Sequence, residues 1–317
     1  MKINFGRKKL YEIDEINFDL AKGKEFIDRC EHEYTLRVKA VADEIEARDC
    51  AIVMQSGPSA SGKTTSALRI AREMKKRGKS AVVVSLDNFF KNITDYPKTD
   101  EGVPDMEHVD ALDIDTINGC LKQLVDTGSS NMPTYDFVTQ RRVRDAMHVE
   151  IDDGDIVIIE GIHALNPLLS QSIPDKEVFK LYTGLRAEYS RDGKRVIATR
   201  DLRITRRLVR DYHFRGHSVR NTLELWKRLM DGENKWIKPF KSDADMLLDT
   251  SFAYEPGLFG PILEELISDP EQGGEFRDIL ITLAELFEPF IYINEDMIPA
   301  DAMLREFVGG LCLDGAQ

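Results

Sequence analysis

The sequence GPSASGKT at residues 57–64 constrains this chain more than any other feature. It fits the pattern G-x-x-x-x-G-K-[S/T] without a mismatch, and average amino-acid usage produces that pattern by chance in about one chain of this length in a hundred. The apolar run 51–54 before it predicts a short strand, and the residues after it, to about Arg77, predict a helix. We therefore expect residues 57–64, which we call the phosphate loop, to bind phosphate between a strand and a helix.

The backbone of the phosphate loop is expected to hold the phosphates. Gly57 and Gly62 permit backbone conformations and a close approach that a Cβ atom would block, so successive amide N–H groups can point inward. The following helix adds the positive end of its dipole. We expect Lys63 to reach the β- and γ-phosphates of ATP and Thr64 to ligate Mg²⁺. The expected nucleotide-binding residues of this segment are Gly57, Ser59, Ala60, Ser61, Gly62, Lys63, Thr64 and Thr65.

Two further apolar runs, 81–84 and 155–159, lack polar alternation, as strands buried on both faces do. Helical patterns lie between them, around 113–125 among others. Strands that alternate with helices indicate a parallel sheet covered on both faces. We therefore predict an α/β fold of the P-loop NTPase type, with a mostly parallel β-sheet and helices on both faces.

The chain divides most simply into one large domain, residues 49–252, with helical extensions at 1–48 and 253–317. Apolar side chains recur every three or four positions from Ile27 to Ile45, which is the repeat of one helical face. We expect both extensions to pack on the domain. The later elements that the patterns predict are helices over 201–214, 218–229, 258–267 and 276–287 and a strand over 244–248.

Two carboxylates directly follow the second and third predicted strands. Open α/β sheets bind their ligands at the carboxyl ends of the strands, which is where Asp87 and Glu160 would lie. Glu160 has the usual position of the acid that orients a magnesium shell, and Asp87 is placed to take a proton from an acceptor hydroxyl. A single aspartate at a strand end is often a turn residue, but two acids beside a phosphate loop favour these roles.

The net charge of −13 conceals a local excess of the opposite sign. Residues 186–228 carry thirteen basic and five acidic side chains, so this segment is +8 and the remainder is −21. An acidic chain is not expected to bind nucleic acid, and the local charge indicates a smaller anion. We expect residues 186–228 to form a helical lid that closes over a triphosphate. Four arginines share one face of its predicted helix: Arg203, Arg206, Arg207 and Arg210.

The sequence predicts neither a membrane span nor a disulfide framework. The longest apolar stretch, 156–159, is far shorter than the ~20 residues that cross a bilayer. Residues 1–9 hold a charge cluster with no apolar run behind it, unlike a secretory signal. The four cysteines include no C-x-x-C pair, which argues against a zinc knuckle. We expect a cytoplasmic protein with no membrane partner.

Several segments resemble, in order, the motifs of the uridine kinase/phosphoribulokinase family of P-loop kinases. They are SLDNFF at 85–90, EHVDALD at 107–113, PTYDF at 133–137, EGI at 160–162, and RITRRLVRD at 203–211 with Arg215-Gly216. Residues 210–218 and 298–310 are similar to a bacterial uridine kinase-like subgroup. Some members of that subgroup carry an N-terminal TGS domain, which we expect this protein to lack.

The resemblance implies roles for individual residues. Asp87 matches the base of the family, and Tyr135 matches a residue that lines the acceptor pocket. Glu107 matches the carboxylate that holds ribose hydroxyls, with Asp105 as a competitor for that role. Gln140 stands where uridine-cytidine kinases have a histidine that contacts the base.

A second base-reading residue of the family, a glutamine, is replaced here by Leu225 or Trp226. Because buried polar groups control substrate discrimination, these departures leave the acceptor open between nucleosides and other small polyols. The Gln140 amide still offers hydrogen bonds to a pyrimidine edge.

The motifs together predict an ATP-dependent kinase that transfers the γ-phosphoryl group to a hydroxyl of a nucleoside or a similar small polyol. The expected catalytic residues are Asp87, Lys63, Arg206 and Arg210, with Arg207 on ATP, Arg203 and Arg215 facing the acceptor or the nucleotide, and Thr64 and Glu160 on Mg²⁺. Two alternatives stay open: a regulatory module that binds nucleotide without phosphorylating anything, and an RNA-binding protein that uses the basic segment. The choice between ATP and GTP stays open, and a homo-oligomer is compatible with the sequence.

Overall fold

A computed structural model describes residues 8–268 and 276–313. Residues 1–7, which carry part of the charge cluster behind the expectation of no secretory signal, lie outside the described residues. Within the described ranges, no helix combines the length and the apolar character needed to cross a membrane.

A five-stranded parallel sheet forms the centre of the molecule, in the order β10-β7-β2-β6-β3. Its strands are β2 (Ile52–Ser56), β3 (Ala81–Ser85), β6 (Ile156–Glu160), β7 (Val178–Gly184) and β10 (Met246–Asp249). Gln55 of β2 and Ser85 of β3 both stand beside Glu160 of β6. The carboxyl ends of these three strands therefore meet at one edge of the sheet. The predicted α/β fold with a mostly parallel sheet is confirmed.

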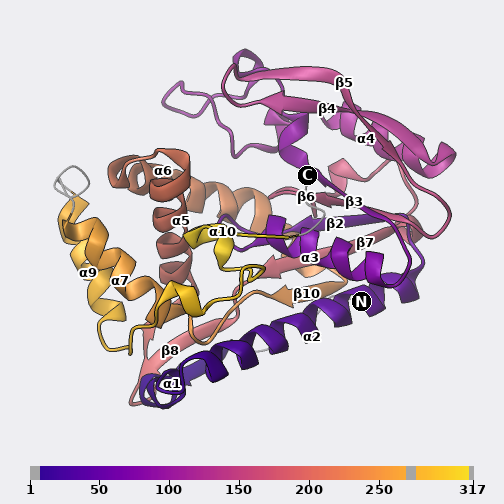
Figure 1. The fold of residues 1–317 in the computed structure, drawn as a ribbon. Coiled ribbons are helices and arrows are strands. Elements are labelled where there is room, and N and C mark those ends of the chain that lie inside the picture. Colours follow the sequence, from indigo (N-terminus) through magenta and orange to yellow (C-terminus); the bar gives the residue numbers. More distant parts are fainter. Residues whose placement is uncertain (1–7, 269–275, 314–317) are drawn as a thin grey trace.

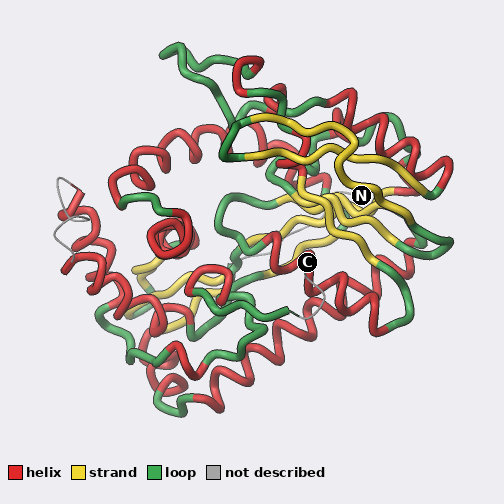
Figure 2. The backbone as a smooth tube through the Cα atoms, turned by 45° about the horizontal axis from the view of Figure 1, so that its top comes forward, coloured by secondary structure: helices red, strands yellow, loops and turns green. Residues whose placement is uncertain are grey.

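Helices cover both faces of this sheet, as Figure 2 shows. On one face, α4 (Ile114–Thr127) shares a core with Ile52 and Met54 of β2. On the other face, α2 (Lys24–Arg48) and α3 (Lys63–Lys76) share a core with Val53. Successive side chains of β2 thus alternate between two cores, which explains why the run has no polar positions.

Six strands of the described residues were not foreseen from the sequence. Strand β7 contains Lys180 and Thr183, so it lacks the uninterrupted apolar run that marks β2 and β6. The hairpin of β4 (Ser129–Asp136) and β5 (Arg141–Glu150) is largely exposed along β5, where little core contact imposes a pattern. A small third sheet joins β1 (Lys9–Glu12), β8 (Ala187–Arg191) and β9 (Lys194–Ile197). The segment expected as a lid therefore begins with a β-hairpin.

The helices that follow lie together to the left of the central sheet in Figure 1. They are α5 (Thr199–Arg215), α6 (Val219–Gly232), α7 (Glu255–Ser268), α9 (Arg277–Phe287) and the short α10 (Arg305–Val308). The Ser218 hydroxyl accepts a hydrogen bond from the Asn221 N–H and so caps the start of α6. Helix α5 ends at Gly216, whose φ of +64° suits glycine.

The N-terminal helices pack directly against the central domain. Helix α2, preceded by α1 (Ile13–Leu20), runs along α3, and its Tyr34 hydroxyl lies 2.7 Å from the Ser66 hydroxyl of α3. The Tyr254 hydroxyl donates to the buried Glu31 carboxylate of α2 at 2.6 Å. One hydrophobic core therefore joins both ends of the chain to the sheet.

Candidate active site

The phosphate loop connects β2 to α3, so its residues lie at the carboxyl edge of the sheet and at the N-terminus of a helix. A Cβ atom on Gly57 would come within 2.1 Å of the Thr183 carbonyl oxygen, so only glycine fits there. Gly62 has a φ of +80°, and Ala60 has the left-handed φ of +57° that few alanines adopt. These conformations turn the loop tightly over the start of α3.

Lys63 lies at the first turn of α3, with its Nζ donating to the Pro58 carbonyl oxygen at 3.1 Å. Burial lowers the pKa of this amine, and surrounding negative charge opposes that shift. The charge comes from four carboxylates drawn from four different segments: Glu160, Glu306, Asp87 and Glu233. The lysine therefore stands at the centre of an acidic ring that an incoming phosphate has to enter.

Thr64 and Glu160, the two expected magnesium ligands, are in contact. The Thr64 hydroxyl donates to Glu160 Oε1 at 3.2 Å. Glu160 is 6% exposed, and burial raises the pKa of its carboxyl while Lys63 opposes this. Both side chains line a cavity of about 1010 Å³ that runs along α3 and β3. Oxygen donors beside an open cavity and next to the phosphate loop suit Mg²⁺, which keeps several waters and takes few protein ligands.

Asp87 follows β3 in a short 3₁₀ turn, and the Ser85 hydroxyl accepts a hydrogen bond from its N–H at 3.3 Å. Water reaches the carboxyl, but the protein around it still displaces enough solvent to raise its pKa. The charges of Lys63 and Arg215 act in the opposite direction. The expected base and the expected phosphate-binding lysine are therefore close enough for their charges to interact, and we call the region between them the cleft.

Glu107 lies on the other side of this cleft, packed against Gly232 of α6. Burial raises the pKa of its carboxyl to about 7, with Arg207 opposing and Glu233, Asp105 and Asp87 adding to the rise. The Asp105 carboxylate accepts a hydrogen bond from the backbone N–H of Glu107 at 3.0 Å. Asp105, the other candidate for holding ribose hydroxyls, therefore helps to position Glu107.

Aromatic side chains form a wall next to Asp87. Tyr135 is buried, and its hydroxyl accepts from the Tyr96 hydroxyl at 3.2 Å. Phe90 packs edge-on against Tyr135 with ring centroids 5.7 Å apart. The charge of Asp87 helps to raise the pKa of Tyr96, behind burial and Tyr135, which shows that this pair lies close to the expected base. Gln140 is not part of the group: it is exposed at the turn between β4 and β5, with a φ of +54°.

Two arginines of α5 lie on the phosphate loop. Arg203 Nε donates to the Ser59 carbonyl oxygen at 2.9 Å, and its Nη2 pairs with Glu233. Arg207 Nη1 donates to the Ser59 hydroxyl at 2.9 Å. Arg203 thus lies against the phosphate loop.

Asp211 is a second meeting point for this helix. Its buried carboxylate pairs with Arg210 at 2.7 Å, with Arg207 at 3.2 Å and, more loosely, with Arg215 at 3.8 Å. Arg210 donates both Nε and Nη2 to one Asp211 oxygen. Of the three arginines, Arg215 is the exposed one and the one whose charge reaches Asp87.

The position of Arg206 requires a correction. We predicted that it contacts phosphate, but its side chain is 0% exposed and its guanidinium is paired with Glu255. Helix α5 presents Arg206 to the interior, whereas Arg203 and Arg207, one helical turn apart, both reach Ser59. Arg206 therefore lies behind the phosphate loop.

Two carboxylates at the loop were missed from the sequence. Glu233, at the end of α6, accepts the Ser59 N–H at 3.1 Å. Glu306, on α10, accepts the Thr65 N–H at 3.3 Å and the Thr65 hydroxyl at 2.5 Å. Glu233 lies in no motif, and the resemblance of residues 298–310 gave no role to Glu306. Each residue reaches the loop only through the packing of a distant segment. Both occupy donors that a phosphate would otherwise use.

The fold and this arrangement define a class: a P-loop kinase fold, in which a parallel sheet presents a phosphate loop and strand-end carboxylates at one edge. The model of the Phosphoribulokinase / Uridine kinase family matches residues 52–251, and the chain belongs to this family.

Relatives agree with this assignment. The chain is 28% identical to a uridine kinase of Borrelia duttonii over 221 residues, which cover 69% of this chain and 96% of the relative. It is 31% identical to a uridine kinase of Bacillus pumilus over 194 residues, 61% of this chain and 83% of that one. A solved structure described as a possible uridine kinase from Bacillus stearothermophilus has a TM-score of 0.46 at 18% identity, and the match covers 67% of this chain and 97% of that one. The protein is a kinase with a small-molecule substrate.

Proposed function

We propose that this kinase transfers the γ-phosphoryl group of ATP to a hydroxyl of a nucleoside or a similar small polyol. The observation that carries the proposal is the cleft shared by Lys63 and Asp87, with Glu107 across from them. A phosphate anchor, a strand-end carboxylate and a second acid are the parts that phosphoryl transfer to a hydroxyl requires.

On the donor side, the phosphate loop and Lys63 hold the β- and γ-phosphates. Arg207 lies at Ser59 and adds positive charge where charge develops on the transferring oxygens. Thr64 and Glu160 would hold Mg²⁺, which supplies charge neutralisation at the phosphates when it is bound. Since the transition state is loose, positioning and electrostatic stabilisation provide most of the acceleration.

On the acceptor side, Asp87 takes the proton of the attacking hydroxyl or holds that hydroxyl in line. Its raised pKa suits this role, because a carboxylate of higher pKa is a stronger proton acceptor. Glu107 accepts hydrogen bonds from neighbouring hydroxyls of the acceptor. The aromatic rings of Phe90 and Tyr135 pack against the apolar face of the acceptor.

The two alternative functions have less support. RNA binding needs an exposed basic surface, but Arg203, Arg206 and Arg210 are buried and paired with carboxylates. A regulatory module without transfer activity does not need Asp87 and Glu107 to face the phosphate loop. The kinase proposal uses all of these positions.

The test is a screen for acceptor-stimulated ADP release by the purified protein with Mg-ATP. Nucleosides, pentoses, other polyols and pantothenate are the acceptors to try. We expect at least one nucleoside or polyol to raise turnover well above the basal rate. Lys63→Ala should abolish that rate, and Lys76→Ala, at an exposed position of the same helix, should leave it unchanged. If no acceptor raises turnover above the basal rate, the transfer proposal is wrong and the regulatory module gains support.

A further inference from the structure

The carbonyl groups of the phosphate loop need hydrogen-bond donors, just as its N–H groups need an acceptor such as phosphate. When successive N–H groups of a loop converge on an anion, the carbonyls of the same peptides point away from it. Those of Ala60 and Ser61 point into the protein, where an unpaired carbonyl would be costly. Ala60 also holds a left-handed φ of +57°, which something in the structure has to maintain.

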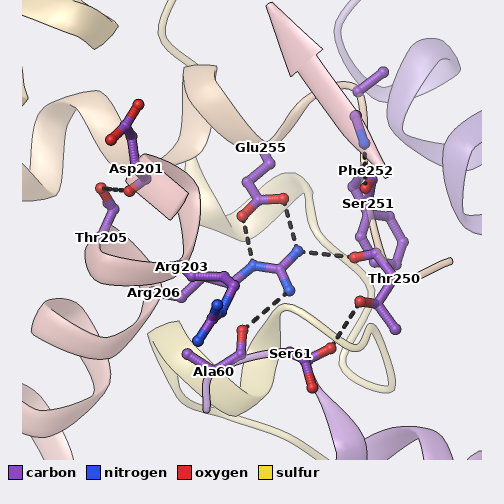
Figure 3. A network of polar contacts seen from close by, with 12 residues as sticks. Ala60, Ser61, Asp201, Arg203, Thr205, Arg206, Thr250, Ser251, Phe252 and Glu255 are labelled. Carbon is purple, nitrogen blue, oxygen red and sulfur yellow. Dashed lines mark hydrogen bonds and ion pairs between the residues drawn. The ribbon is translucent and has the colours of Figure 1, made fainter. Parts of the chain in front are cut away.

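Two buried residues, Arg206 and Thr250, supply those partners, and Glu255 holds Arg206 in place. We call Arg206, Thr250 and Glu255 the loop clamp. The Thr250 hydroxyl donates to the Ser61 carbonyl oxygen at 2.7 Å. Arg206 Nη1 makes a longer contact of 3.5 Å with the Ala60 carbonyl oxygen. Figure 3 shows the clamp directly behind the loop, between α5 and the segment that follows β10.

The clamp is itself held in one geometry. Arg206 donates through Nε and Nη2 to the two oxygens of Glu255, at 2.5 and 2.7 Å, and through Nη2 to the Thr250 carbonyl oxygen at 2.8 Å. All three side chains are 0% exposed. A planar guanidinium with a bidentate carboxylate fixes orientation as well as distance. The Thr250 carbonyl oxygen accepts a hydrogen bond from Arg206, and the Thr250 hydroxyl donates one to the Ser61 carbonyl oxygen.

This arrangement goes beyond what stability alone would select. A buried ion pair recovers little or none of the cost of removing two charges from water, and apolar residues of similar volume stabilise as well or better. Arg206 cannot touch a nucleotide either, because its side chain is fully enclosed. What the polar clamp provides, and an apolar cluster would not, is a defined direction for two carbonyls of the phosphate loop.

We propose that Arg206, Thr250 and Glu255 are positioning residues that set the phosphate affinity of the loop by holding the Ala60 and Ser61 carbonyls outside it. The inference rests on the proposed function, because it assumes that the loop binds the phosphates of ATP. The clamp should affect binding of the donor phosphates, whatever base is attached to them, and should not affect binding of the acceptor.

The experiment is isothermal titration of the full-length protein with Mg-ATP and with magnesium tripolyphosphate, combined with the acceptor KM. Thr250→Val keeps the shape of the side chain and removes the hydroxyl that serves Ser61. We expect the Kd for both probes to rise about tenfold, because a buried carbonyl loses its partner. The acceptor KM should stay unchanged, and Thr250→Ser should restore the wild-type Kd.

Thr205→Val is the matched control. Thr205 is also a fully buried threonine, next to Arg206 on α5, but its hydroxyl donates to the Asp201 carbonyl within its own helix at 2.9 Å. It should leave the Kd of both probes unchanged. Arg206→Met removes the arginine of the clamp, but it leaves the Glu255 carboxylate buried without a partner and so endangers folding. The test therefore rests on the comparison of Thr250→Val with Thr205→Val.

The outcomes separate the two proposals. If the wild type binds Mg-ATP and Thr250→Val binds it equally well, or if Thr205→Val weakens it to the same degree, the clamp has no positioning role. A change in the acceptor KM alone would also overturn the inference. If the wild type binds neither probe, the proposed function fails, and the inference fails with it.

Discussion

Three acids in the cleft show how position decides the chemistry of identical groups. Burial is the largest cause that raises the pKa of Asp87, Glu107 and Glu160. Lys63 opposes the rise for Asp87 and Glu160, whereas Glu107 has Arg207 on one side and three other acids around it. Burial and the neighbouring acids raise the pKa of Glu107 to about 7. Its charge changes within the range of ordinary assays.

The pKa of Glu107 predicts a pH dependence for the acceptor. Because its pKa is raised to about 7, lowering the pH through 7 protonates the carboxyl and removes an oxygen that accepts from acceptor hydroxyls. The kcat/KM for the acceptor should be level above pH 8 and fall by up to about tenfold per pH unit below the pKa. Steady-state kinetics over roughly pH 5.5 to 9 measure the profile.

Two variants make this profile decisive. Glu107→Gln should lower kcat/KM at high pH and remove the acid limb. Glu101→Gln, at an exposed position of the same loop, should keep the limb. An unchanged limb in Glu107→Gln would assign the titration to another group.

At the scale of elements, α5 acts as a fixed support for the phosphate loop. Its Arg206 side faces the interior and its Arg203 and Arg207 side chains reach Ser59. A helix bound to the loop on both sides is not free to swing as a whole. We therefore expect α5 not to move as part of a closing lid.

Helix α10 makes a second prediction about an element. Its Glu306 carboxylate occupies the Thr65 N–H and hydroxyl at the start of α3, where the helix dipole and Lys63 favour a phosphate. Removing this negative charge in Glu306→Gln should lower the Kd for Mg-ATP about fivefold, the scale of one moderate electrostatic contact. Titration calorimetry at low ionic strength measures it.

Glu295→Gln serves as the control for α10. Glu295 is an exposed acid of the same C-terminal extension, and its side chain is not part of the ring around Lys63. The Kd of the Glu295→Gln variant for Mg-ATP should equal that of the wild type. Weaker binding in Glu306→Gln would mean that Glu306 supports the nucleotide site instead of competing for it.

The elements also show what the sequence can predict. Strands β2, β3 and β6 and the phosphate loop were predicted because their signals are local: an apolar run for two cores and a motif for one turn. The roles of Glu233, Glu306 and Arg206 could not be predicted in this way, because each depends on which distant segment packs against the loop. Asp87 and Glu160 needed only one further rule, that parallel strands end at the same edge.

At the scale of the whole molecule, one core connects the N-terminal helices, the sheet and the C-terminal helices. Ile45 of α2 and Phe307 of α10 are both almost fully buried in it, and Glu31 pairs with Tyr254 across it. The N-terminal extension is thus continuous in packing with the domain that carries the phosphate loop. The molecule should unfold as one cooperative unit.

Ile45→Ala tests this cooperativity. Truncating a fully buried isoleucine should lower the free energy of unfolding by about 2–4 kcal/mol. Urea denaturation followed by circular dichroism and by tryptophan fluorescence should give coincident transitions at a lower midpoint. Leu36→Ala, at a half-exposed position of the same helix, should have little effect. Two separate transitions would show that α2 folds independently of the sheet.

We propose that Asp87 and the phosphate loop form one active site in which Asp87 serves phosphoryl transfer and the loop serves nucleotide binding. Single-turnover kinetics and titration of Asp87→Asn with Mg-ATP test it most directly, with Asp95→Asn, an exposed neighbour, as the control. We expect the Kd for Mg-ATP to stay within about twofold of the wild type and the transfer rate to fall by at least about a hundredfold. Near-normal transfer in Asp87→Asn, with the control unchanged, would contradict the account.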